Sequence, residues 1–149
     1  MAEILFSRDN WMPSVVTDGD RLLLEVVGGA DALHGPRLFT APLREEHVAA
    51  LRESLRRHLL LHAALLPLCD AAGVRGPWDE EAATALLDPI LLGSPEKVDA
   101  TLREVRVDRR VLVAHHAGLD LLKRRRYFEA AQSAVPTADW GRVRKHLGP

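Results

Sequence analysis

The sequence has a single cysteine, Cys69, and lacks any long apolar run. One cysteine cannot form an internal disulfide bond, and this favours a reducing compartment. The most apolar run, residues 59–69, is 11 residues long and includes His62, so it is too short to cross a bilayer. The first nine residues carry three charges and have no apolar core of a signal peptide. We therefore expect a cytoplasmic protein without membrane contact.

The motifs that mark common enzyme classes are also missing. Gly28-Gly29 follows an apolar run but lacks the further glycines of a dinucleotide-binding loop, and no Gly-Lys-Ser/Thr sequence occurs. No Gly-x-Ser-x-Gly elbow is present, and the carboxylates are not paired beyond ordinary helix starts. The sequence therefore predicts no cofactor and no catalytic residue. The sequence favours a protein without enzymatic activity, but it does not exclude an enzyme.

Composition places the chain among globular proteins. It has 149 residues, of which 47% are hydrophobic and 28% charged, with a formal net charge of −1. This length suits one domain with a real core, and the near-zero charge gives no global attraction to nucleic acid or acidic membranes. No repeat or linker interrupts it. We predict one domain over residues 1–149.

Residues 1–42 favour strands. Short apolar runs over residues 3–8, 11–16, 21–27 and 37–40 are separated by turn residues, including Asp9-Asn10 and Gly28-Gly29. A parallel crossover needs a dozen or more residues, which these connections lack. The pattern predicts an antiparallel meander of three or four strands.

Residues 43–149 favour helices, and the longest apolar periodic stretch runs from Leu43 to Gly73. We expect a central helix over about 43–66, a kink or restart at Pro67 and an end at Gly73. Further helices are predicted from Trp78 to about Pro89, and over 95–105, 108–117, 119–133 and 139–147. The fold class is therefore α+β: the meander packs on a C-terminal bundle of four or five helices.

Histidines are the first candidates for chemistry. His58 and His62 are spaced i, i+4, so on one helix their rings can share a metal ion, which the His115-His116 doublet could complete. His47 lies 11 residues before His58, roughly 16 Å away along a helix axis. Leu59 stands where a zinc hydrolase has its glutamate. We favour packed core histidines and keep His58 and His62 as weak metal candidates.

Cys69 and the charge pattern supply two further observations. Cys69 lies in the most apolar part of the chain, where burial raises the pKa of a thiol, so we expect an inert core residue. Residues 76–100 hold six acids against one lysine, whereas residues 101–149 hold eleven bases and five acids. The densest basic cluster includes Arg124, Arg125 and Arg126, which are candidates for binding a partner or phosphates. A solvated helix face, or pairing with the acidic segment within the fold or across a dimer, is the favoured explanation.

Several short segments of the sequence resemble those of a family of small bacterial proteins. They are residues 57–61 (RHLLL), 65–73 (LLPLCDAAG) and 86–93 (LLDPILLG), together with Phe6-Ser7 and Trp11. The resemblance covers roughly residues 1–135 and is to proteins of unknown function from high-GC Gram-positive bacteria. The excess of arginine over lysine, 17 to 3, agrees with a GC-rich genome. The resemblance implies a compact cytosolic protein and no particular activity.

Three functional hypotheses remain open. The leading one is a non-enzymatic binding or interaction protein, of the immunity or adaptor type, with an unknown protein partner and self-association into a homodimer. The second is a small enzyme or ligand binder with a pocket between sheet and helices that uses His58, His62 or His115. The third is nucleic-acid binding through Arg124–Arg126, although no nucleic-acid module accompanies these residues.

Overall fold

A computed structural model describes residues 3–8 and 12–136 of the chain. The N-terminal part forms one antiparallel sheet in the order β1-β2-β3-β4. The strands are β1 (Glu3–Phe6), β2 (Ser14–Asp18), β3 (Arg21–Gly28) and β4 (Arg37–Pro42). The predicted meander is therefore confirmed, with four strands. β2 begins at Ser14, after Pro13, which has no amide to give to the ladder, and Trp11, the expected start of this strand, lies outside the described residues.

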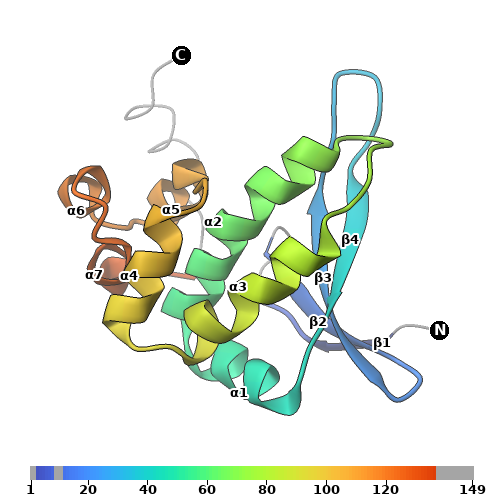
Figure 1. The fold of residues 1–149 in the computed structure, drawn as a ribbon, viewed down its shortest axis with the longest axis horizontal. Coiled ribbons are helices and arrows are strands. Elements are labelled where there is room, and N and C mark those ends of the chain that lie inside the picture. The colour runs from blue at the N-terminus through green and yellow to red at the C-terminus, as the bar shows by residue number, and fades with distance from the viewer. Residues whose placement is uncertain (1–2, 9–11, 137–149) are drawn as a thin grey trace.

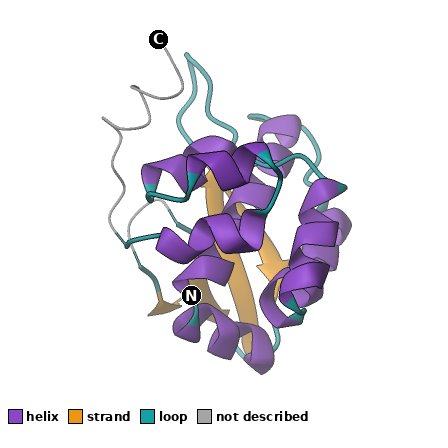
Figure 2. Cartoon of the chain, turned by 90° about the vertical axis from the view of Figure 1, so that its left-hand side faces the viewer, coloured by secondary structure: helices purple, strands orange, loops and turns teal. Residues whose placement is uncertain are grey.

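The sheet presents one face to the helices. Side chains alternate between the two faces of a strand, so every second apolar residue points into the core. Cross-strand partners on this inner face include Val15 with Leu24, Leu24 with Ala41, and Val26 with Phe39. All five are buried in the core. The helices lie on one side of the strands (Figures 1 and 2), which gives a two-layer α+β arrangement as predicted.

The stretch expected as one central helix is two helices. α1 (Glu45–Glu53) ends and α2 (Leu55–Ala72) begins at Ser54, whose backbone is extended with φ −127°. The Ser54 hydroxyl accepts a hydrogen bond from the Arg57 amide at 3.1 Å, so it caps α2. Arg8 donates to the Leu51 carbonyl at 2.7 Å, one of the last carbonyls of α1. The Ser54 cap and the guanidinium of Arg8, which lies in the β1–β2 connection, therefore stabilise the break between α1 and α2.

Pro67 does not end or restart the helix. α2 continues through it to Ala72 and stops at Gly73, which has φ +63° as the sequence predicted for a terminating glycine. Proline has no amide hydrogen, so the Ala63 carbonyl four residues earlier lacks its helical donor. The Asp108 amide supplies one at 2.8 Å. The carbonyl that Pro67 leaves without a helical donor therefore accepts a hydrogen bond from a residue 45 positions later in the chain.

Of the remaining α-helices in the described residues, all but the first are shorter than predicted, and one predicted helix is divided in two. They are α3 (Glu80–Leu92), α4 (Pro95–Arg103), α5 (Arg109–Ala114), α6 (Leu119–Lys123), α7 (Tyr127–Ala130) and a 3₁₀ turn, η1 (Ala131–Ser133). α4 and α5 begin at the expected caps, Ser94 and Asp108. α3 runs past Pro89. The described residues thus contain seven α-helices, and the helix expected over 139–147 lies outside them.

The helix expected over 119–133 is divided by the basic cluster. Arg125 adopts φ +59°, a left-handed conformation that a helix interior does not accommodate. The polypeptide therefore leaves α6 after Lys123 and enters α7 at Tyr127.

The core is organised around α2. It packs against β3, α1, α3 and α5, and it contributes ten buried residues: His58, Leu59, Leu60, Leu61, His62, Ala63, Ala64, Leu65, Cys69 and Ala72. Between residues 12 and 131 the buried apolar side chains other than Val16 and Leu23 form one cluster. No helix of residues 3–8 or 12–136 is both long and apolar enough to cross a membrane.

Candidate functional site

His58 lies in the core with both ring nitrogens bonded. Arg8 Nε donates to Nδ1 at 3.1 Å, so Nε2 carries the proton and donates to the Pro13 carbonyl at 2.8 Å. Burial, followed by the charges of Arg8 and His115, lowers the pKa of His58 to about 4, although the bond to Pro13 acts in the opposite direction. The ring is therefore neutral at pH 7. Its lone pair already accepts a hydrogen bond, so it is not available to a metal ion.

His62 is buried one turn further along α2. Its Nδ1 has no hydrogen-bond partner within the described part of the chain. Burial, with smaller contributions from His58 and His115, lowers the pKa of His62 to about 3, while Asp108 acts to raise it. The sequence correctly placed His58 and His62 on one helix. The structure gives them different surroundings, since Arg8 and Pro13 hold one ring and apolar packing holds the other.

His115 is the third histidine of the predicted pocket. It ends α5 and is buried, and its Nδ1 lies 2.8 Å from the Val135 carbonyl, to which it donates. The three rings are near enough to influence one another electrostatically. Among residues 3–8 and 12–136, however, no group of three or more His, Cys, Asp or Glu side chains could hold a metal ion. The pockets described below contain none of these three histidines.

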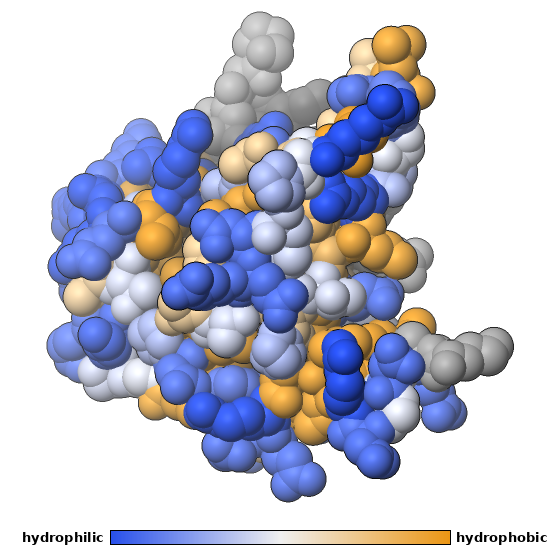
Figure 3. All heavy atoms as spheres, turned by 45° about the vertical axis from the view of Figure 1, so that its right-hand side comes forward, coloured by the Kyte–Doolittle hydropathy of each residue, from blue (hydrophilic) through white to orange (hydrophobic). Residues whose placement is uncertain are grey.

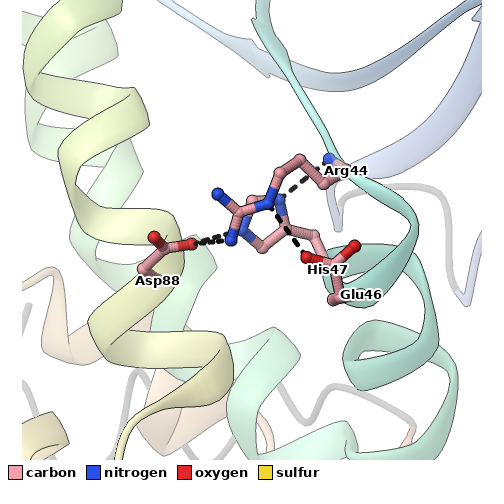
Figure 4. Close-up of polar contacts among 4 residues, drawn as sticks. All are labelled: Arg44, Glu46, His47 and Asp88. Carbon is pink, nitrogen blue, oxygen red and sulfur yellow. Dashed lines mark hydrogen bonds and ion pairs between the residues drawn. The ribbon is translucent and has the colours of Figure 1, made fainter.

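His47 belongs to a polar cluster that joins α1 to α3 (Figure 4). Its Nδ1 accepts from the Arg44 amide at 3.0 Å, and its Nε2 donates to Asp88 Oδ1 at 2.7 Å. Arg44 Nη2 donates to the same Asp88 oxygen at 2.7 Å, and Arg44 Nε donates to Glu46 at 3.1 Å. The His47 hydrogen bond, followed by Arg44, lowers the pKa of Asp88. A histidine beside a carboxylate suggests a general base, but this ring has no free lone pair, so the cluster fastens helices together.

Cys69 is buried on α2, opposite the end of β3. Burial, followed by the charge of Asp70, raises the pKa of the Cys69 thiol to about 12. A β-carbon at Gly28 would come within 2.7 Å of Cys69 Cβ, so the strand and the helix approach closely only because residue 28 has no side chain. The thiol is therefore an unreactive core group at neutral pH, as the sequence predicted.

The predicted partner-binding cluster, Arg124 to Arg126, has mixed roles. Arg125 Nη2 donates to the Arg103 carbonyl, and Arg103 Nε returns a bond to the Arg125 carbonyl at 3.1 Å. Arg126 forms an ion pair with Glu129 one turn later. Two of the three guanidinium groups therefore hold α4 and α7 in place. Arg124 is exposed and forms no ion pair with the described residues.

A groove between α2 and the start of α5 is a site that the sequence analysis missed. Its volume is about 510 Å³, and residues from both elements line it: Pro67, Asp70, Ala71, Arg106, Val107, Asp108, Arg109 and Arg110. Asp108 caps α5 and binds the guanidinium of Arg110 through both carboxylate oxygens, at 3.1 and 2.9 Å. Arg106 and Arg109 are exposed and form no ion pair within the described part of the chain. The Arg109-Arg110 doublet is a sequence signal for a charged site. The sequence does not reveal that these arginines line one groove with Asp70.

Three further pockets lie around α1, two of them beside the sheet and the third against α2 and α3. They are lined by residues 20–23 and 42–45, by Leu22 with one face of α1, and by α1 with Arg57 and the end of α3. These are open hollows beside helix ends, and their linings contain no cysteine or histidine. They do not correspond to the catalytic pocket between sheet and helices that the second hypothesis required.

The β3–β4 connection, residues 29–36, forms an arm that projects beyond the helices at the top of Figure 1. Asp31 Oδ1 accepts from the amides of Leu33 and His34, at 2.8 and 2.7 Å, and lies 2.9 Å from the His34 ring. These bonds, that of Leu33 first, lower the pKa of Asp31. Leu33 is 88% exposed in this ordered turn. Figure 3 shows an apolar tip on the arm.

Comparisons with known proteins agree with the resemblance seen in the sequence. No curated protein and no solved structure matches the chain. The model of one protein family matches residues 1–148, which is nearly the whole sequence. The chain therefore belongs to this family, a family of unknown function (DUF6357).

Proposed function

We propose that this protein is a cytoplasmic, non-enzymatic binding protein of high-GC Gram-positive bacteria, of the immunity or adaptor type. It contacts a protein partner through the arm of residues 29–36. The observation that carries the proposal is the exposed Leu33 at the tip of that arm.

The geometry of the arm supports this role. Loop tips are usually polar, whereas Leu33 presents a large apolar side chain to solvent. The Asp31 hydrogen bonds hold the turn in one conformation, so little conformational entropy remains to be lost on binding. An apolar side chain presented on a preorganised turn suits insertion into a pocket of another protein.

The state of the titratable core groups also supports a binding role. The lone pairs of His47 and His58 accept hydrogen bonds, and the thiol of Cys69 has a raised pKa. These groups stabilise the fold rather than offering a base or a nucleophile to a substrate.

Affinity capture from a lysate of the host organism tests the proposal. The wild-type chain is expected to enrich a partner that the Leu33→Asp variant loses. Leu92→Asp is the matched control, since Leu92 is also an exposed leucine (45%) but lies at the end of α3. A partner retained equally by Leu33→Asp would contradict the role of the arm. Failure of the wild type to enrich any partner would contradict the proposal as a whole.

A second candidate function is the binding of a small anion in the groove between α2 and α5. Two guanidinium groups that form no ion pair with the described residues, Arg106 and Arg109, line it beside apolar Val107 and Pro67. Paired arginines recognise phosphate and carboxylate groups well. A chemical-shift titration with inorganic phosphate should move the amides of residues 106–110, and the Arg106→Ala/Arg109→Ala variant should abolish this. Equal shifts in the variant would contradict the site.

Nucleic-acid binding through Arg124–Arg126 ranks third. Arg125 and Arg126 already bind the Arg103 carbonyl and Glu129. Of these three arginines, Arg124 alone forms no ion pair with the described residues and remains for phosphates. A gel-shift experiment at low salt is expected to show no complex.

A further inference from the structure

The groove between α2 and the start of α5 has charges of opposite sign on its two walls. Arg106 and Arg109 come from the α5 side, whereas Asp70 comes from α2. All three residues are exposed, and none of them forms an ion pair with a residue that the structure describes. The groove therefore combines two cations and one carboxylate that the described part of the chain does not neutralise.

The other charged pair of the groove is already satisfied. Arg110 binds both carboxylate oxygens of Asp108, at 3.1 and 2.9 Å. The hydrogen bonds and charge of Asp108, and more weakly the charge of Asp70, raise the pKa of Arg110, although burial acts in the opposite direction. Asp70 is therefore within electrostatic range of the start of α5, but Arg110 is bound to Asp108 instead. The carboxylate of Asp70 remains available to a cation from outside the chain.

The backbone holds the two walls of the groove together. α5 packs against α2 (Figure 1), and the Asp108 amide donates to the Ala63 carbonyl at 2.8 Å. Ala63 can accept this bond because Pro67, four residues later, has no amide hydrogen. The ring of Pro67 lines the groove, as do the apolar residues Ala71 and Val107. The charged groups and an apolar surface are therefore in place before a ligand binds, which lowers the entropic cost of binding.

We propose that this groove binds a zwitterion that carries a carboxylate and an ammonium group at the two ends of an apolar chain. The carboxylate binds Arg106 and Arg109, because guanidinium groups donate paired hydrogen bonds to carboxylates. The ammonium group binds Asp70, and the methylene groups pack on Pro67 and Val107. Amino acids with a terminal amine have this chemistry. The proposal rests on the anion site of the second candidate function and adds a cationic group to its ligand.

Asp70 favours a zwitterion over a simple anion such as phosphate. Like charges within one site repel each other, so an anion held by the two arginines keeps an unfavourable interaction with the carboxylate of Asp70. A zwitterion replaces this repulsion by an ion pair. The volume of the groove, about 510 Å³, also lies in the range of sites that bind small organic molecules.

Chemical-shift titrations with 6-aminohexanoate and with hexanoate test the proposal. Both ligands have the same carboxylate and apolar chain, and only the first has an ammonium group. We expect 6-aminohexanoate to move the amides of residues 70–71 and 106–110 with a dissociation constant about threefold lower than that of hexanoate, as an exposed ion pair provides. Hexylamine, which lacks the carboxylate, should bind more weakly than 6-aminohexanoate.

Variants separate the contributions of the two walls. Asp70→Asn removes the carboxylate, so 6-aminohexanoate and hexanoate should bind it equally well. Asp120→Asn makes the same change in charge at an exposed residue of α6, outside the groove, and should keep the wild-type preference. The Arg106→Ala/Arg109→Ala variant should bind neither ligand.

The outcomes distinguish the zwitterion from the anion site itself. A wild type that binds hexanoate as tightly as 6-aminohexanoate would overturn the zwitterion and leave the anion site in place. So would an Asp70→Asn variant that still prefers 6-aminohexanoate. If neither of these ligands nor phosphate moves the amides of the groove, both the zwitterion and the anion site are wrong.

Discussion

Acid should destabilise this protein well before its carboxylates are protonated, because two buried histidines must stay neutral in the fold. The pKa values of His58 and His62 are about 4 and about 3 in the folded protein, against 6.5 for the unfolded side chain. Below pH 6.5 the unfolded chain therefore binds protons that the folded chain does not. Stability is fully present above pH 6.5 and is lost as the pH falls toward 4 and 3.

The size of the effect follows from proton linkage. At pH 5 each unfolded histidine is about 1.5 pH units below its pKa, which corresponds to about 2 kcal/mol of lost stability per ring. The two rings together should lower the free energy of unfolding by about 4 kcal/mol, against the 5–15 kcal/mol typical of a domain. Replacing His62 by leucine removes one titrating ring and its unpartnered Nδ1, so this variant should lose only about 2 kcal/mol between pH 7 and pH 5.

Urea unfolding at pH 7, 6 and 5 measures these values for the wild type and for His62→Leu. His34→Gln, on the exposed arm, is the control because it removes a histidine without disturbing the core. A wild type equally stable at pH 7 and pH 5 would refute the reasoning. The same would follow if His62→Leu lost as much stability as the wild type, since His62 would then not titrate differently in the two states.

Three further predictions concern stability and reactivity. Ser54→Ala should lower the free energy of unfolding by about 1 kcal/mol in urea, because the α2 amide of Arg57 loses its cap; no change would show that the cap is unimportant. Gly29→Ala should cost about 2 kcal/mol or more, since the new methyl group would lie 2.6 Å from the Gly73 carbonyl oxygen at φ +69°, whereas Gly35→Ala meets open space and should cost little. Cys69 should resist a disulfide reagent at pH 8 in the native state and react after denaturation; rapid native-state labelling would contradict its burial and raised pKa.

The histidines show how far local sequence reasoning extends. The i, i+4 spacing correctly placed His58 and His62 on one helix, because that relation depends only on helix geometry. It could not predict that Arg8, 50 residues earlier, donates to His58, or that Asp88, 41 residues later, accepts from His47. These partners come from segments that the fold brings together, and they decide whether a ring can act as a ligand or base.

Pro67, Pro89 and Ser54 also show where local sequence reasoning fails. Pro67 is expected from the sequence to kink or restart its helix and Pro89 to end its helix, yet both prolines lie inside helices. At Pro67 the Asp108 amide replaces the missing donor, so the local penalty is offset by a hydrogen bond to the Ala63 carbonyl from a residue 45 positions later in the sequence. Ser54, in contrast, was read as part of a continuous helix. Its capping bond and the Arg8 bond to Leu51 together stabilise a break that periodicity alone does not show.

The sequence by itself determined the fold class, the strand order, the helix caps at Ser94 and Asp108, and the burial of α2. These features depend on turn residues, apolar periodicity and short connections, which act over a few residues. Tertiary structure alone decided the break at Ser54, the protonation states of the core histidines and the groove of Arg106 and Arg109. All of these depend on contacts between segments far apart in the chain, which local pattern does not encode.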